Sequence, residues 1–180
     1  SVCRNVSISS QRGILSGAGT MTGSISANSG AISPGIGNTM TLGGLTLNPA
    51  SGGGLGSLVH IDINSSGSSL VAVTGSASLA GILELNVDPS TAPGNYTLLT
   101  ASGGITGTFD SVTFTGATPN YSLSYLPVGA PTYVQFTYLG PSVNIPATVN
   151  GSPIYSPAVV CCGRPIILGP LPVPGSGATT

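Results

Sequence analysis

The chain has 180 residues, enough for one domain with a sizeable core. Only 4% of its residues are charged, against about 25% in ordinary globular proteins, and the formal net charge is −1. This balance excludes the basic patch that binds nucleic acids, so we expect no nucleic-acid partner. Such a low density of charge is typical of a surface that becomes covered by other copies of the same chain. The alternative is a secreted domain that its many hydroxyl groups keep soluble.

No apolar run approaches the ~20 residues that a membrane-spanning helix needs, so we expect no membrane span. The chain starts at Ser1 without a signal peptide, which fits a mature secreted product whose leader has been removed, although a shortened sequence would look the same. In the first segment, residues 1–12, Val2, Val6 and Ile8 alternate loosely with polar residues. This segment is a candidate strand that either covers the core or pairs with the edge of another molecule.

From Gly13 to Pro49 the sequence is almost entirely Gly, Ser, Thr, Ala, Ile and Leu. Turn signals recur here too closely for the long strands of a sandwich, and they suit the short rungs of a parallel β-solenoid. A flexible Gly/Ser linker is the alternative, but the apolar residues alternate as they do in strands. The expected strands are Ile14–Ser16, Thr20–Ser26, Ala31–Ser33 and Thr39–Leu47.

Alternation of apolar and polar residues continues to Tyr138, and most of the aromatic residues lie in its later part. In the first strand of this part Val59, Ile61 and Ile63 form the apolar face, so His60 and Asp62 should point to solvent. The large aromatic side chains would close one end of a core that smaller residues fill elsewhere. The expected strands are Ser57–Asn64, Ser69–Gly75, Ser78–Val87, Asn95–Thr100, Thr108–Thr115, Tyr121–Leu126 and Pro131–Tyr138.

After residue 139 the chain becomes rich in proline, with eight of its fifteen prolines between residues 140 and 180. Prolines at this density cannot sit in a central strand, because each removes a hydrogen-bond donor. The segment is also apolar, so we expect an extended arm that lies on a groove or strand edge of its own subunit or of the next. The apolar residues assigned to assembly through this arm and the N-terminal segment are Val2, Val6, Ile8, Val159, Val160, Ile166, Ile167 and Leu168.

The three cysteines, Cys3, Cys161 and Cys162, are disulfide candidates near the two ends of the chain. Their spacing does not provide the four ligands of a structural zinc site. In an oxidising compartment a disulfide within or between subunits is the expected use, and the odd count leaves one thiol over.

Candidate catalytic groups are few, and we expect no enzyme, no metal site and no cofactor. His60 could form a triad with a serine and either Asp62 or Asp110, but no G-x-S-x-G elbow accompanies them. Glu84 with Asp88 or Asp110 could form a glycosidase pair, but the chain contains no Trp for sugar stacking. Asp88 followed by Pro89 is better explained as the start of a turn.

Several segments in order resemble the C-terminal end of bacterial autotransporter passenger domains. They are G-I-L-S-G-A-G-T (13–20), A-I-S-P-G (31–35), L-T-L (45–47), L-V-A-V-T-G-S-A-S-L-A-G-I-L-E-L (70–85), P-G-N-Y-T-L-L-T-A (93–101) and G-I-T-G-T-F-D-S-V (104–112). The resemblance covers about residues 13–139 and implies a right-handed parallel β-helix on the cell surface, with a C-terminal β cap and no catalytic residues. That family continues into a linker helix and a membrane β-barrel, whereas a Pro-rich arm follows here. Either the barrel has been removed or the chain is a free-standing relative, and the Cys-bearing arm favours the second alternative.

The sequence therefore predicts three parts: an N-terminal strand or arm (1–12), a β-helix with an aromatic-rich cap (13–139), and an extended arm (140–180). The expected function is that of a structural subunit of an extracellular bacterial filament. Copies would assemble head to tail by stacking and by strand or arm exchange. The alternative is a monomeric surface adhesin that binds a host surface or glycan.

Overall fold

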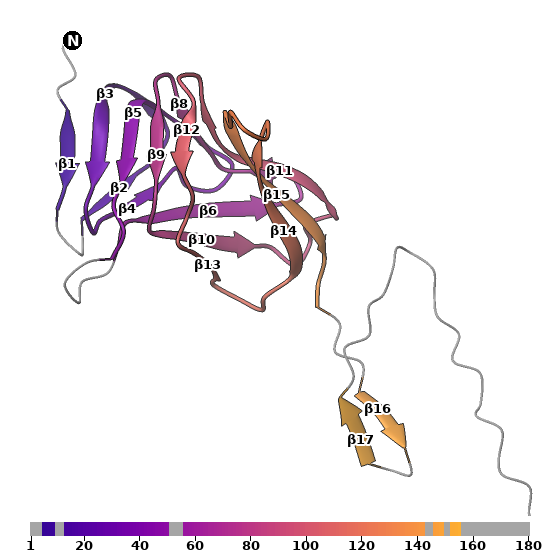
Figure 1. The fold of residues 1–180 in the computed structure, drawn as a ribbon. Helices are drawn as coiled ribbons and strands as arrows, with labels where there is room; N and C mark the ends of the chain where they lie inside the picture. The colour runs from indigo at the N-terminus through magenta and orange to yellow at the C-terminus, as the bar shows by residue number, and fades with distance from the viewer. Residues whose placement is uncertain (1–4, 10–12, 51–55, 143–145, 150–151, 156–180) are drawn as a thin grey trace, which may run out of the picture. The chain divides into compact units, whose positions relative to one another are not determined.

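A computed structural model describes residues 5–9, 13–50, 56–142, 146–149 and 152–155 (Figure 1). Within this part every regular element is a β-strand, so the all-β prediction is confirmed for the described residues. The chain divides into two compact units, Ser1–Ser142 and Val143–Thr180. Each unit is described by itself.

The strands of the first unit are short, and most have three to nine residues. The first seven are β1 (Val6–Ile8), β2 (Ile14–Ser16), β3 (Gly19–Ala27), β4 (Ala31–Ser33), β5 (Thr39–Leu47), β6 (Leu58–Asn64) and β7 (Gly67–Ser68). The next eight are β8 (Leu70–Val73), β9 (Ala77–Leu79), β10 (Ile82–Val87), β11 (Gly94–Ala101), β12 (Ile105–Gly107), β13 (Ser111–Phe114), β14 (Asn120–Leu126) and β15 (Tyr133–Gly140).

The parallel strands pair in three columns. In column 1 the first residues of β3 and β5 pair with each other, and β8 and β11 follow. Column 2 has the order β1, β3, β5, β9 and β12, and β3 and β5 contribute their last residues to it. Column 3 has the order β2, β4, β6, β10 and β13. The chain visits a strand of each column in turn before it returns to the first.

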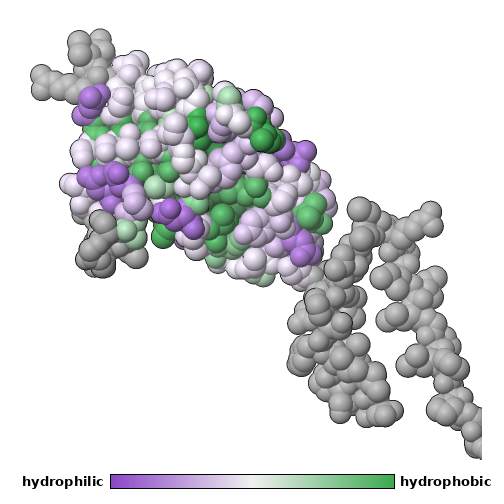
Figure 2. Space-filling model, in the orientation of Figure 1, coloured by the Kyte–Doolittle hydropathy of each residue, from purple (hydrophilic) through white to green (hydrophobic). Residues whose placement is uncertain are grey.

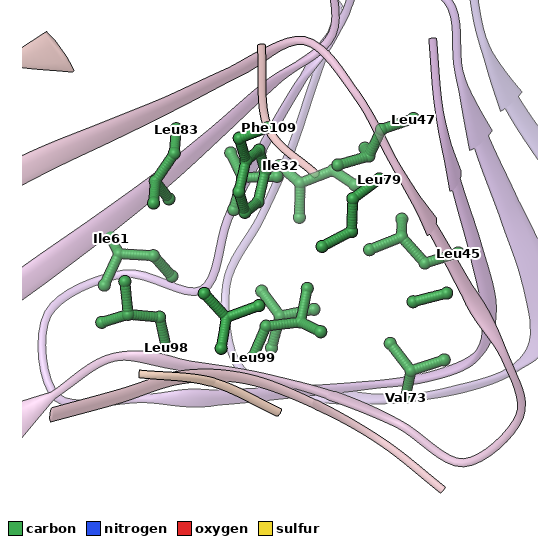
Figure 3. Packing of buried hydrophobic residues seen from close by; sticks show 14 of the residues in the cluster. Ile32, Leu45, Leu47, Ile61, Val73, Leu79, Leu83, Leu98, Leu99 and Phe109 are labelled. Atoms are coloured by element: carbon green, nitrogen blue, oxygen red, sulfur yellow. The ribbon is translucent and has the colours of Figure 1, made fainter. Parts of the chain in front are cut away.

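Each column turns alternate side chains to one common interior, as the period of two in a strand requires. Ile32, Ile61 and Leu83 come from column 3, and none of them is more than 1% exposed. They meet Val73 and Leu99 of column 1 and Leu45, Leu47 and Leu79 of column 2 (Figure 3). Val59, Ile61 and Ile63 all face this core, so the inward face predicted for this strand is confirmed.

Glycine occupies the corner between columns 1 and 2 at successive levels. A Cβ on Gly43 would lie 2.0 Å from the carbonyl oxygen of Thr22, and one on Gly75 would lie 2.4 Å from that of Gly43. One on Gly103 would lie 2.8 Å from the carbonyl carbon of Gly75. Only glycine lets the backbones of neighbouring levels approach this closely.

The predicted strand Ser78–Val87 is two strands in the structure. β9 ends at Leu79 and β10 begins at Ile82, with Gly81 at a φ of 73° between them. A Cβ on Gly81 would lie 2.3 Å from the carbonyl oxygen of Ser57. One glycine within a continuous apolar alternation is a weak turn signal, which explains the error.

The last strands of the first unit change the pairing from parallel to antiparallel. β15 pairs antiparallel with both β11 and β14, and the register of β11 shifts between Thr97 and Leu99. This bulge allows both Leu98 and Leu99 to be buried at 1% exposure. Phe136 of β15 is completely buried, and its ring centroid lies 5.6 Å from that of Tyr121 and 6.4 Å from that of Phe114.

The second unit contains an antiparallel pair, β16 (Pro146–Val149) and β17 (Ser152–Tyr155). It forms a separate two-stranded sheet in the described part of the chain. The sequence predicts an extended arm here and not this hairpin, because the prolines mask the signal of Asn150-Gly151, a dipeptide that favours two-residue hairpin turns.

Among the described residues no helix is long and apolar enough to cross a membrane.

Candidate functional site

The structure describes two of the eight residues that the sequence assigns to assembly. Ile8 of β1 is 9% exposed and belongs to the core, whereas Val6 is 36% exposed. β1 pairs with β3 of its own chain, so this segment covers the core of its own subunit. The other six residues (Val2, Val159, Val160, Ile166, Ile167 and Leu168) and the cysteines Cys3, Cys161 and Cys162 lie outside the described residues.

At the N-terminal end of column 3, β2 has one paired and one unpaired edge within the described part of the chain. The carbonyl oxygen of Gly13 accepts a hydrogen bond from the amide of Ala31 at 2.8 Å, and the amide of Gly17 donates to Ser33 at 2.9 Å. These residues therefore face β4. Because backbone groups alternate along a strand, the N–H and C=O of Ile14 and Ser16 point the other way, toward the free edge.

The side chains at this edge are unusually apolar for an exposed position. Ile14 is 67% exposed, and β1 adds the half-exposed Val6 at the same end. Long unpaired edges invite pairing with another strand, and proteins usually protect them with charged residues or proline. β2 has neither.

The outer face of column 3 carries a second cluster, which we call the polar ladder: Glu84, His60, Asp62, Asn86 and Thr115. Parallel register places His60 opposite Glu84, and Asp62 opposite Asn86. Nδ1 of His60 lies 2.7 Å from Oε2 of Glu84, and Nε2 lies 3.4 Å from Oδ1 of Asp62. Nδ2 of Asn86 donates to the same Asp62 oxygen at 2.8 Å, and the Thr115 hydroxyl donates to Asn86 at 2.9 Å.

The prediction that His60 and Asp62 point to solvent is right for the face and wrong for the exposure of Asp62. Both belong to the outward set, but Asp62 is only 8% exposed and the His60 side chain 23%. Their neighbours on β10 cover them, because matching residues of parallel strands lie about 5 Å apart. The sequence separates His60 from Glu84 by 24 positions, so only the register brings them together.

Each acid among the candidate catalytic residues has a partner in the structure. The two ring nitrogens of His60 lie against two different carboxylates, those of Glu84 and Asp62. The other two acids have their own partners: Asp110 accepts from the amide of Gly81 at 2.7 Å, and Asp88 accepts from the amide of Ser90.

Asp88 confirms the predicted turn. Its Oδ1 accepts hydrogen bonds from both the hydroxyl and the amide of Ser90, at 2.5 and 2.8 Å, and these bonds lower the pKa of the exposed Asp88 carboxyl. In the part of the chain that the structure describes, no group of three or more His, Cys, Asp or Glu side chains could hold a metal ion.

The outer face of column 2 carries hydroxyl side chains at every level, in register from one strand to the next. These residues are Ser7, Ser26, Thr46, Ser78 and Thr106. They alternate with buried residues, so they point outward, and we call them the hydroxyl row. The row is not evident in the sequence, because its members are 19 to 32 positions apart and become neighbours only through the register.

No family model matches this chain, and no curated protein matches it.

Neutral and small side chains dominate the visible surface of the first unit. Figure 2 shows a mostly pale face with small, separate hydrophilic and hydrophobic patches. This is the surface expected from a chain with 4% charged residues.

Proposed function

We propose that this chain is a structural subunit of an extracellular bacterial filament and that it has no catalytic role. The observation that carries the proposal is the apolar edge of β2, with which no strand in the described part of the chain pairs, at one end of three parallel columns. A column of parallel strands can be extended by any strand that satisfies its last row of backbone groups. Contacts of this kind are heterologous and do not close, so repetition gives a fibre.

The proposed architecture is a right-handed parallel β-helix with a C-terminal cap, as the resemblance to autotransporter passenger domains implies. The cyclic visit to three columns and the common interior support the helix. Its right hand is the usual one for parallel crossovers. The antiparallel strands β14 and β15, with the aromatic residues around Phe136, are the proposed cap.

The surface supports assembly outside the cell. Few charges oppose close contact between copies, and the neutral hydroxyl groups can be covered at little electrostatic cost. We place the protein outside the cell because a β-helix of this type is a surface structure in the family that it resembles. A disulfide from Cys3 to Cys161 or Cys162 would then lock neighbouring subunits covalently.

Electron microscopy of the full chain, together with sedimentation at increasing concentration, tests this function. We expect fibres, and on non-reducing gels we expect bands of higher mass that collapse to the single chain with reductant. A chain that stays monomeric at high concentration without reductant would contradict the filament. Fibres without bands of higher mass on the gels would support the filament and contradict the disulfide between subunits.

The second candidate is a monomeric surface adhesin, and the hydroxyl row is the observation that favours it. Five in-register hydroxyl groups about 5 Å apart present a regular set of donors and acceptors to a polyhydroxylated glycan. A monomer that binds a glycan array, and loses binding when Thr46 and Ser78 are replaced by Val and Ala, would support this candidate.

A further inference from the structure

The described part of the second unit is a sheet of two strands, β16 and β17, with no third strand paired to it there. An isolated pair of strands is at best marginally stable in water, and three or more strands are needed for independent stability. The hairpin therefore needs another strand or surface to become a stable element.

We propose that the β16–β17 hairpin of one copy pairs with the free edge of β2 in a second copy. The inference rests on the proposed filament and names the two segments that make its repeating contact. The edge offers the backbone groups of Ile14 and Ser16, and the hairpin offers a strand that has one unpaired side. Pairing converts two incomplete sheets into one continuous sheet.

The two sides of β16 differ in their hydrogen bonding. Val149 and Ser152 are partners across a two-residue connection, and in such hairpins this closing pair is hydrogen-bonded. Since the pattern alternates, the backbone groups of Ala147 face β17 and those of Thr148 face outward. The N–H of Thr148 is therefore available to a strand of another copy.

Matched proline and alanine variants of the full chain test the pairing. Ile14→Pro removes an N–H from the free edge of β2 and leaves the bonds to β4 intact, whereas Ile14→Ala keeps the N–H. Thr148→Pro and Thr148→Ala do the same for β16. We expect each proline variant to raise the concentration needed for assembly about tenfold or more, with a much smaller effect of each alanine variant.

Mixing the two proline variants gives the sharpest result. Ile14→Pro retains a good hairpin and Thr148→Pro retains a good edge, so an equimolar mixture should stop at the dimer in sedimentation velocity. Wild-type fibres with assembly unaffected by either proline would overturn the pairing and leave the filament proposal standing. A wild-type chain that never assembles would overturn both.

A photo-crosslinking residue at position 148 keeps the test independent of how well the proline variants fold. In a mixture of isotopically light and heavy full-length chains, we expect crosslinks from position 148 to residues 13–17 of a different copy, identified by mass spectrometry. Crosslinks confined to the same chain, or directed to another strand, would overturn the proposal.

Discussion

At Gly75 the backbone of one level lies against that of the preceding level, and a side chain has no room. A Cβ at this position would be 2.4 Å from the carbonyl oxygen of Gly43, below any normal contact distance, and backbone cannot move aside as a flexible side chain can. Gly43 and Gly103 occupy the same corner at neighbouring levels. A clash at one of them therefore disturbs the spacing of the column.

We expect Gly75→Ala to lower the free energy of unfolding by about 1–3 kcal/mol, the range found for overpacked interiors. Urea unfolding followed by circular dichroism measures the change. Gly116→Ala is the matched control, because a Cβ there has nothing within 4 Å and the residue has no positive φ. Equal stability of the two variants would show that this corner is less tightly packed than the structure indicates.

For the polar ladder, the residue types predict which face of the strand a side chain lies on but not its exposure or its partners. The alternation in β6 places His60 and Asp62 on the outer face, and the structure agrees. Their low exposure and their contacts with Glu84 and Asn86 depend on which strand lies beside β6. No local pattern contains that information, since the partners are on a strand reached after a full circuit of the chain.

Among the elements, β14 carries a group whose protonation is linked to folding. The hydroxyl oxygen of Tyr125 accepts a hydrogen bond from the amide of Phe109 at 3.0 Å, and burial raises the pKa of Tyr125 above its ordinary value of 10.0. The folded state then holds the phenolic proton more tightly than the unfolded state does. The contribution of this group to the free energy of unfolding is fully present below pH 10, and it is lost as the pH rises through the raised pKa.

We expect the free energy of unfolding of the wild type to decrease above pH 10 more steeply than that of Tyr125→Phe. At neutral pH the variant should be the less stable of the two, because the Phe109 amide loses its acceptor. Denaturant unfolding of both proteins across the alkaline range gives the two slopes. Parallel slopes would show that Tyr125 makes no contribution to the alkaline loss.

Strand positions in the first unit were largely predictable. β2, β4 and β5 match the expected boundaries, because turn residues bracket a clear apolar alternation. One kind of error occurs where the chain changes column without a strong turn signal, as at Gly81, and another where prolines hide a hairpin, as in β16 and β17. The short strands β7 and β12 were not predicted, and the predicted strand Thr108–Thr115 is wrong for residues 108–110, which lie between β12 and β13.

For the whole molecule, the small number of charges predicts that assembly depends little on salt concentration. With seven charged side chains other than histidine and a net charge of −1, neither attraction nor repulsion between copies has a large electrostatic component. Salt screens such components and leaves backbone hydrogen bonds and apolar contacts almost unchanged.

The concentration needed for assembly should therefore change less than about twofold between low and physiological ionic strength. Light scattering of the full chain at a series of salt concentrations measures it. A steep dependence on salt would indicate a charged interface and would argue against pairing through the uncharged edge of β2.

The sequence by itself determined that the described chain is all-β, where most strands lie and which side of each strand is apolar. These properties depend on neighbours within a few residues: alternation with a period of two, and glycine or proline at the turns. The tertiary structure decided the three columns, the polar ladder, the hydroxyl row and the free edge of β2. Each of these depends on the register between strands 17 to 32 residues apart, and a repetitive Gly/Ser/Thr sequence fits several registers about equally well.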